Sequence, residues 1–191
     1  LFTISEQIKN ISILLNPIIP ISTKKVLEAM NLNEKDISID RIKKENKVIK
    51  KVRSLDTDVN FIFQKFDWPT KGIISGVFGS QRILNGKPKW PHYGIDIAAK
   101  KGTKIKSSGS GIVTMAEDGL YYTGGTIIMD HGHGISTIYS HLEDIMVNVG
   151  DEIKQGDIIG TVGSTGRSTG PHLDFRINWF QTRLDPMSIL Q

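Results

Sequence analysis

Two imidazole–carboxylate pairs have the residue types and the spacing of metal ligands. His92 and Asp96 are four residues apart, and His172 and Asp174 are two residues apart. Because side chains at even separations along a β-strand share one face, each pair is predicted to direct two ligand groups into one cleft. Imidazole and carboxylate without a thiolate form the ligand set of a catalytic zinc, which keeps one position open for water. The sequence contains no cysteine, which excludes a cysteine-ligated metal and a disulfide framework.

The remaining three histidines are interpreted from their neighbours. His141 follows Tyr139 by two residues, which predicts that both side chains share one face of a strand, with Tyr139 as a candidate aromatic residue of the cleft. His131 and His133 flank a glycine and follow Asp130, which indicates a turn between strands. A single histidine on a half-buried strand is more often a hydrogen-bonded structural residue than a ligand. No histidine therefore identifies a site by itself.

The elements that position these residues follow from the distribution of glycine. All 19 glycines lie at or after Gly72, so the preceding part is predicted to be helical and the rest to consist of strands and turns. Between Ile39 and Leu55, apolar residues recur at helical spacing among lysines, which predicts an amphipathic helix with a basic outer face. A shorter helix is expected from the N-cap Thr23 to Met30, after an irregular entry at Pro17–Pro20.

Short runs rich in Val, Ile, Thr and Phe predict the strands. They are bounded by Gly, Asp or Asn and comprise residues 73–78, 103–106, 111–115, 126–130, 136–141, 158–162 and 172–177. These runs leave no room for crossover helices, which favours an antiparallel sheet or sandwich. Residues 78–88 are expected to form a loop that makes one wall of the cleft. The predicted fold is mainly β, with a partly helical accessory segment at residues 1–67 and the β domain at residues 68–191.

Length and charge exclude several classes of protein. A chain of 191 residues with 38% apolar and 23% charged residues is neither disordered nor too short for a core. No apolar run approaches the ~18 residues of a membrane span. The net charge of +4, without an arginine-rich stripe, argues against a nucleic-acid partner. The chain begins at Leu1 rather than Met, so we expect a fragment or processed product, with room for a membrane anchor upstream of Leu1.

Three segments in order resemble the lysostaphin-type zinc metalloendopeptidases, which have a duplicated hybrid motif fold. They are Pro91–Asp96 (PHYGID), Tyr139–Leu142 (YSHL) and Gly163–Phe175 (GSTGRSTGPHLDF), and the likeness runs from about Trp68 to Leu190. Members of this family hydrolyse peptide bonds of bacterial peptidoglycan. The resemblance implies the same reaction here, one zinc ion per chain and a location outside the cytoplasm, in the periplasm or cell envelope. It also implies cell-wall or divisome proteins as partners.

The resemblance assigns a role to each candidate residue. The first motif implies His92 and Asp96 as zinc ligands, and the middle motif implies a catalytic His141. The last motif is normally His-x-His, in which the first histidine, here His172, is catalytic and the second is the third ligand. That third position is Asp174 in this sequence, a legitimate but shorter zinc ligand. Two carboxylates and one imidazole cancel the charge of a divalent cation, which predicts a weaker Lewis acid and a site more tolerant of manganese.

Two alternatives stay open at this point. The departure at Asp174 is compatible with a catalytically degenerate module that binds peptidoglycan or regulates a partner hydrolase. The Gly150–Gly160 segment has the cadence of a lipoyl or biotinyl carrier hairpin, although Lys154 lacks the usual methionine flank. For residues 1–67 we expect packing on the peptidase domain and partial occlusion of its cleft.

Overall fold

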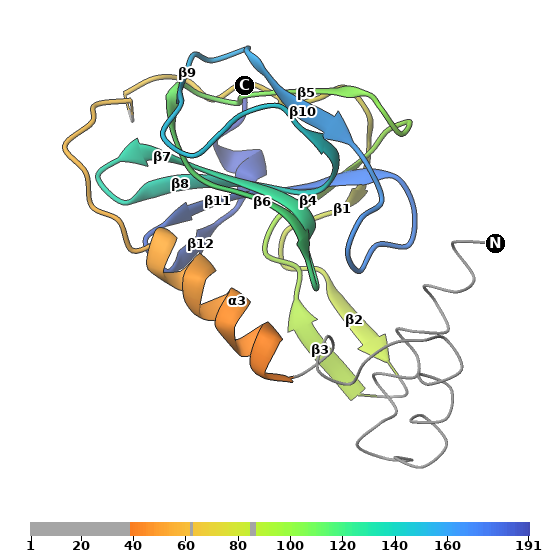
Figure 1. The fold of residues 1–191 in the computed structure, drawn as a ribbon. Helices are drawn as coiled ribbons and strands as arrows, with labels where there is room; N and C mark the ends of the chain where they lie inside the picture. Colours follow the sequence, from red (N-terminus) through yellow and green to blue (C-terminus); the bar gives the residue numbers. More distant parts are fainter. Residues whose placement is uncertain (1–38, 62, 85–86) are drawn as a thin grey trace. The chain divides into compact units, whose positions relative to one another are not determined.

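The computed structural model describes residues 39–61, 63–84 and 87–191 (Figure 1). By its internal contacts the chain divides into two compact units, Leu1–Lys47 and Val48–Gln191. The irregular entry at Pro17–Pro20 and the helix predicted from Thr23 lie outside the described residues. The assignment of residues 1–67 to an accessory segment and of 68–191 to a peptidase domain stays a prediction.

The predicted basic helix is confirmed as α3 (Ile39–Val52). Asp40 in its first turn and Lys50 and Lys51 in its last turn complement the helix dipole. Within the second unit, Ile49 and Val52 pack on a small apolar cluster of the sheet, which attaches the end of this helix to the β-structure. No helix among the described residues has the length and apolar character needed to cross a membrane.

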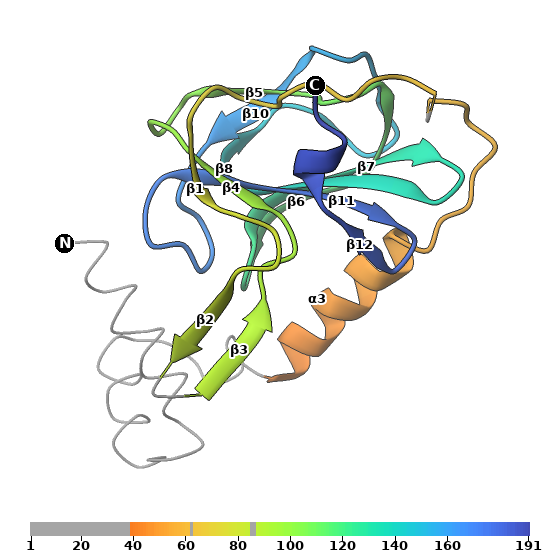
Figure 2. The same cartoon turned by 180° about the vertical axis from the view of Figure 1, so that it is seen from behind.

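The described part of the second unit is built almost entirely from antiparallel strands, as predicted. They are β1 (Ile73–Gly76), β2 (Gln81–Leu84), β3 (Lys87–Pro91), β4 (Ile95–Ala98), β5 (Lys104–Lys106), β6 (Gly111–Leu120), β7 (Gly124–Gly132), β8 (Ile135–Ile145), β9 (Glu152–Ile153), β10 (Ile158–Val162), β11 (His172–Trp179) and β12 (Thr182–Leu184), followed by the 3₁₀ turn η2 (Pro186–Ser188). The long sheet has the order β1-β4-β11-β8-β7-β6-β9. In both views β5 and β10 lie over one face of this sheet (Figure 1, Figure 2).

The alternation of β11 shows how the sheet separates core from cleft. Leu173, Phe175 and Ile177 are fully buried and pack with Ile105 of β5 and Ile159 of β10 in the main core. Because side chains alternate across a strand, the intervening residues His172, Asp174 and Arg176 lie on the opposite face. The apolar positions of β11 therefore fix which polar residues face the cleft.

Two expectations for local structure were wrong. Residues 78–88 are not simply a loop, because β2 and β3 pair there as a separate two-stranded sheet. The segment around His131 is not all turn either, since His131 lies within β7 and only His133 lies in the connection to β8. Pairing with β8 extends β7 beyond its predicted apolar run, whereas β2 and β3 pair with each other where no strand was predicted.

Candidate metal centre

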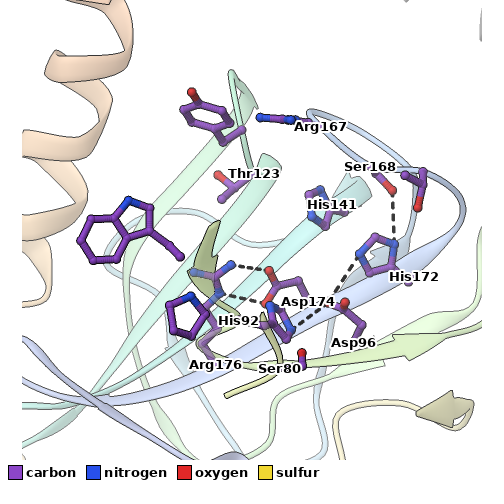
Figure 3. Close-up of a pocket in the computed structure, with 14 residues that line it drawn as sticks. Ser80, His92, Asp96, Thr123, His141, Arg167, Ser168, His172, Asp174 and Arg176 are labelled. Carbon is purple, nitrogen blue, oxygen red and sulfur yellow. Dashed lines mark hydrogen bonds and ion pairs between the residues drawn. The ribbon is translucent and has the colours of Figure 1, made fainter. Parts of the chain in front are cut away.

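A cleft opens over the polar face of β4, β8 and β11 (Figure 3). It brings together all five residues singled out from the sequence: His92, Asp96, His141, His172 and Asp174. Its rim includes Trp90 from β3, and Tyr122 and Arg167 from two loops. The β2–β3 hairpin thus contributes to one wall, as expected for residues 78–88. None of the described residues between 48 and 67 lines this cleft.

Three ligand-type atoms converge on one point of the cleft. His92, Asp96 and Asp174 each offer one ligand atom, and these atoms lie within 4.8 Å of one another. Nε2 of His92 is 3.1 Å from Oδ1 of Asp96, yet this buried nitrogen has no hydrogen-bond partner among the described residues. Two ligand atoms of one tetrahedral zinc ion are about 3.4 Å apart. The three residues therefore fit a divalent cation, and an orphaned buried imidazole nitrogen indicates that something belongs between them.

Strand register positions the two carboxylates. Asp96 of β4 lies directly opposite Asp174 of β11 in the antiparallel pairing, and both are almost completely buried. Two like charges in such a pair repel each other unless cations compensate them. On the other side of β4, Gly76 of β1 leaves the space that Asp96 needs, because a Cβ atom there would lie 2.4 Å from Oδ2 of Asp96.

His92 reaches the site by a different route from the one predicted. It does not share a strand with Asp96 but lies in the link between β3 and β4. Its backbone is fixed by two bonds to the loop before β2: the His92 amide donates to the Ser80 carbonyl, and the Gly79 amide donates to the His92 carbonyl, both at 2.8 Å. The even-spacing argument was wrong for this pair because it assumed a continuous strand, whereas the chain bends between the two ligands.

His141 and Tyr139 lie on opposite faces of the sheet, contrary to the sequence prediction. Tyr139 is fully buried in the core, against Phe175, and is not a cleft residue. His141 has a φ of 66°, and around it β8 carries one residue more than its partner β7. This β-bulge changes the alternation, so that His141 faces the cleft although it is two residues from a core tyrosine.

The two remaining imidazoles are each held by a hydrogen bond at Nδ1. Nδ1 of His141 lies 2.8 Å from the Thr165 carbonyl oxygen, and Nδ1 of His172 lies 2.8 Å from that of Gly170. Since a carbonyl can only accept, each Nδ1 carries the proton and each Nε2 presents a lone pair. The ring centroids are 4.7 Å apart, and Nε2 of His172 is 3.6 Å from Oδ1 of Asp96.

Burial keeps His141 neutral. Removal from water lowers the pKa of His141, and the attraction of Asp174 opposes this only in part. A neutral imidazole with a free Nε2 is able to accept a proton at neutral pH. The arrangement therefore supplies a base next to the three convergent ligand atoms.

Arg176 is a residue of the site that the sequence interpretation missed. Its Nε donates to Oδ1 of Asp174 at 2.8 Å and its second terminal nitrogen donates to Oδ2 at 2.5 Å. Burial by itself would raise the pKa of Asp174, but Arg176 outweighs it and lowers this pKa to about 2. The signal was present, because Arg176 follows His172 and Asp174 at the same two-residue spacing. The sequence predicted a net charge of zero for the site with a divalent cation, because only the three ligands were counted. The guanidinium of Arg176 adds one positive charge to that sum.

The other two histidines lie outside the cleft. His131 is fully buried, with Nδ1 2.6 Å from the Ser110 carbonyl oxygen and Nε2 2.8 Å from the Thr137 hydroxyl. His133 is exposed in the β7–β8 turn, where its Nε2 lies 2.9 Å from Oδ1 of Asn60. Both are structural residues.

Comparisons with known proteins agree with this geometry. The family model described as Peptidase family M23 matches residues 90–186. Peptidoglycan DD-endopeptidase ShyA of Vibrio cholerae is 37% identical over 116 residues, which is 60% of this chain and 27% of that protein. The structure of a zinc-containing peptidase from Vibrio cholerae matches with a TM-score of 0.61 at 31% identity, over 65% of this chain and 40% of that one.

A third similarity is to the catalytic domain of the antimicrobial peptidase lysostaphin from Staphylococcus simulans. It has a TM-score of 0.52 at 36% identity and covers 59% of this chain and 86% of that domain. The chain spans about a third or less of the length of the first curated relatives that it matches.

Proposed function

Since the chain belongs to peptidase family M23, we propose that it is a zinc-dependent endopeptidase that hydrolyses peptide bonds of bacterial peptidoglycan. The relatives named as peptidoglycan endopeptidases support the substrate class. One observation of the structure carries the proposal: the buried Nε2 of His92, which has no hydrogen bond among the described residues, converges with Asp96 and Asp174 beside two imidazoles whose Nδ1 atoms are held by backbone carbonyls.

His92, Asp96 and Asp174 would hold the cation. A zinc ion bound there supplies Lewis-acid chemistry, which polarises a peptide carbonyl and makes water more acidic. The chain itself supplies the proton transfers. Nε2 of His141 or His172 can accept a proton from the attacking water and, once protonated, can donate it to the departing amine nitrogen.

The rim residues suit an extended peptide. Trp90 is 86% exposed on β3, next to the cleft, which is unusual for so large an apolar side chain and typical of a binding surface. Arg167 on the opposite loop offers a cation for a substrate carboxylate. Such a rim suits the stem or cross-bridge peptides of a cell wall, and a cell-wall substrate implies a reaction outside the cytoplasm.

The first experiment combines metal analysis with digestion of purified muropeptides. The purified chain is expected to contain close to one zinc per chain, to lose activity on treatment with a chelator and to regain it when zinc is restored. His141→Ala and His172→Ala should be inactive, whereas His133→Asn, which changes the exposed histidine of the β7–β8 turn, should stay active. A chain that binds zinc but releases no peptide from any muropeptide would contradict the proposal.

A second candidate is favoured by the Arg176–Asp174 ion pair. Because a guanidinium already neutralises one ligand carboxylate, the fold could serve as a binding or regulatory module without chemistry. This candidate predicts no bound zinc and no effect of chelators on binding to peptidoglycan. The same experiment therefore separates the two.

A further inference from the structure

A positively charged residue, Arg176, lies next to the three convergent ligand atoms but is not one of the ligands. Arg176 contacts Asp174 through both carboxylate oxygens, at 2.8 and 2.5 Å. The Asp174 side chain is 5% exposed and that of Arg176 is 22% exposed, so water and salt screen this charge much less than they screen a surface arginine. A divalent cation held by Asp174 would feel the guanidinium directly.

We infer that Arg176 tunes the cation site: it holds Asp174 in place as a ligand and its positive charge weakens divalent-cation binding while keeping the bound cation electrophilic. This inference rests on the proposed function for its catalytic consequence, but it concerns the affinity of the site for a cation. Arg176 is in this sense a positioning residue.

The charge count supports the inference. A divalent ion with one neutral imidazole and two carboxylates has a net charge of zero, and Arg176 raises it by one. Two imidazoles and one carboxylate would leave the same single positive charge on a divalent ion. The exchange of an imidazole for a carboxylate at position 174 is therefore compensated two residues later on the same face of β11.

Ion pairing and cation binding are compatible at Asp174. An ionised carboxylate has about four lone-pair sites on its two oxygens, and the guanidinium takes one on each oxygen. The others are available to a cation. Nε2 of His92 is an independent observation that points to a cation on that side, since this buried nitrogen has no hydrogen bond among the described residues and lies 3.1 Å from Oδ1 of Asp96.

Gly94 lies in the link between β3 and β4, and its backbone packs directly against the Arg176–Asp174 ion pair. A Cβ atom at this position would lie 2.6 Å from Cγ of Arg176 and 2.9 Å from Oδ1 of Asp174. Because the backbone between His92 and Asp96 lies so close, Arg176 cannot swing away on that side. The guanidinium of Arg176 is thus held close to Asp174 and to the link that joins His92 and Asp96.

The Arg176–Asp174 ion pair also affects what a histidine at position 174 would do. Replacing Asp174 by histidine provides the ligand type usual in the family, but it leaves the half-buried Arg176 without its carboxylate and next to a dication. We therefore expect Asp174→His to bind zinc more weakly than the double variant Asp174→His with Arg176→Gln. The effect of each substitution should depend on the other.

The test measures Zn²⁺ affinity of the full chain, freed of metal, by competition with a chromophoric chelator. Arg176→Gln should bind Zn²⁺ roughly tenfold or more tightly than the parent, because the repulsion of a nearby charge is removed. Arg176→Lys keeps the charge and should stay within about threefold of the parent. Arg183→Gln is the matched control, since Arg183 lies near Arg176 but donates to Asn178 and not to Asp174.

The outcomes separate this inference from the proposed function. Equal or weaker zinc binding by Arg176→Gln, or equal gains in Arg176→Lys, would overturn the tuning role even if the parent is an active zinc peptidase. Zinc binding by Arg176→Gln but not by the parent would support the tuning role and count against the peptidase. Failure of every variant, including the Asp174→His double variant, to bind zinc would overturn both.

Discussion

The carbonyl oxygen of Thr165 lies 2.8 Å from Nδ1 of His141 and thereby decides which nitrogen of this histidine faces the cleft. The contact joins two segments that are far apart along the chain. The loop before β11 holds the proton on one side of the ring, and the β-bulge of β8 turns the other side towards the ligands. The orientation of the His141 ring thus depends on backbone atoms rather than on another charged side chain.

Removing the imidazole of His141 should abolish proton transfer and leave the cation site intact. We expect His141→Ala to lower kcat/KM on muropeptides on the order of 10²-fold or more. Zinc content should not change, because His141 is not one of the three convergent ligands. A His141→Ala variant that loses its zinc would mean that this residue is a ligand.

The hydroxyl of Thr165 should matter for both stability and rate. It donates to the Leu142 carbonyl at 2.7 Å and accepts from the Gly125 amide at 2.9 Å, which ties the loop to β8 and β7. Thr165→Val is expected to lower the free energy of unfolding by about 1–2 kcal/mol and to reduce kcat more than it raises KM. Urea unfolding and steady-state kinetics check these effects.

The matched control for Thr165 is Thr114→Val, in β6. Its hydroxyl makes one bond, to the Ile128 carbonyl at 3.2 Å, and Thr114 does not line the cleft. This variant should lose stability without a selective loss of kcat. Equal kinetic effects in the two variants would show that Thr165 acts through stability alone.

The space at Gly76 should be required for cation binding. In Gly76→Ala the new Cβ would lie 2.4 Å from Oδ2 of Asp96, so the carboxylate must move. We expect at least a roughly tenfold loss of Zn²⁺ affinity, since a displaced ligand no longer meets His92. Gly102→Ala serves as the control, because Gly102 has a φ of 83° but open space around it, and it should cost stability without changing zinc binding.

His131 should make the fold sensitive to mild acid. Burial lowers the pKa of His131 to about 4, whereas the unfolded chain should have the ordinary value near ~6.5. Below pH ~6.5 the unfolded state binds the proton first, so stability falls as the pH drops from there towards 4. Between pH 7 and pH 5 this amounts to about 2 kcal/mol.

The measurement is urea unfolding of the parent and of His131→Gln at both pH values. The parent should lose about 2 kcal/mol more than the variant, because glutamine does not titrate and other groups contribute equally to both. Identical losses in the two proteins would show that His131 is not the source of the acid sensitivity.

The residue types of the site and the mainly β fold follow from the sequence, since both depend on local patterns. Alternating apolar residues such as Leu173, Phe175 and Ile177 predict β11 and the face on which His172 and Asp174 lie. The first glycine, Gly72, marks where the strands begin, but the helical prediction for the whole preceding part was wrong for the described residues after Val52, which form no helix. Such features are determined by a few neighbouring side chains, so a single sequence is sufficient to predict them.

How these residues meet depends on contacts that form only in the folded chain. The bulge that turns His141 away from Tyr139 arises from the register of β8 against β7, and the bend that brings His92 to Asp96 depends on bonds to the loop before β2. The two-residue spacing places Arg176 on the same face of β11 as Asp174, but the close approach of the backbone at Gly94 to this ion pair is a tertiary contact. Register, bends and such close approaches depend on contacts between distant segments, and spacing along the chain carries no information about them.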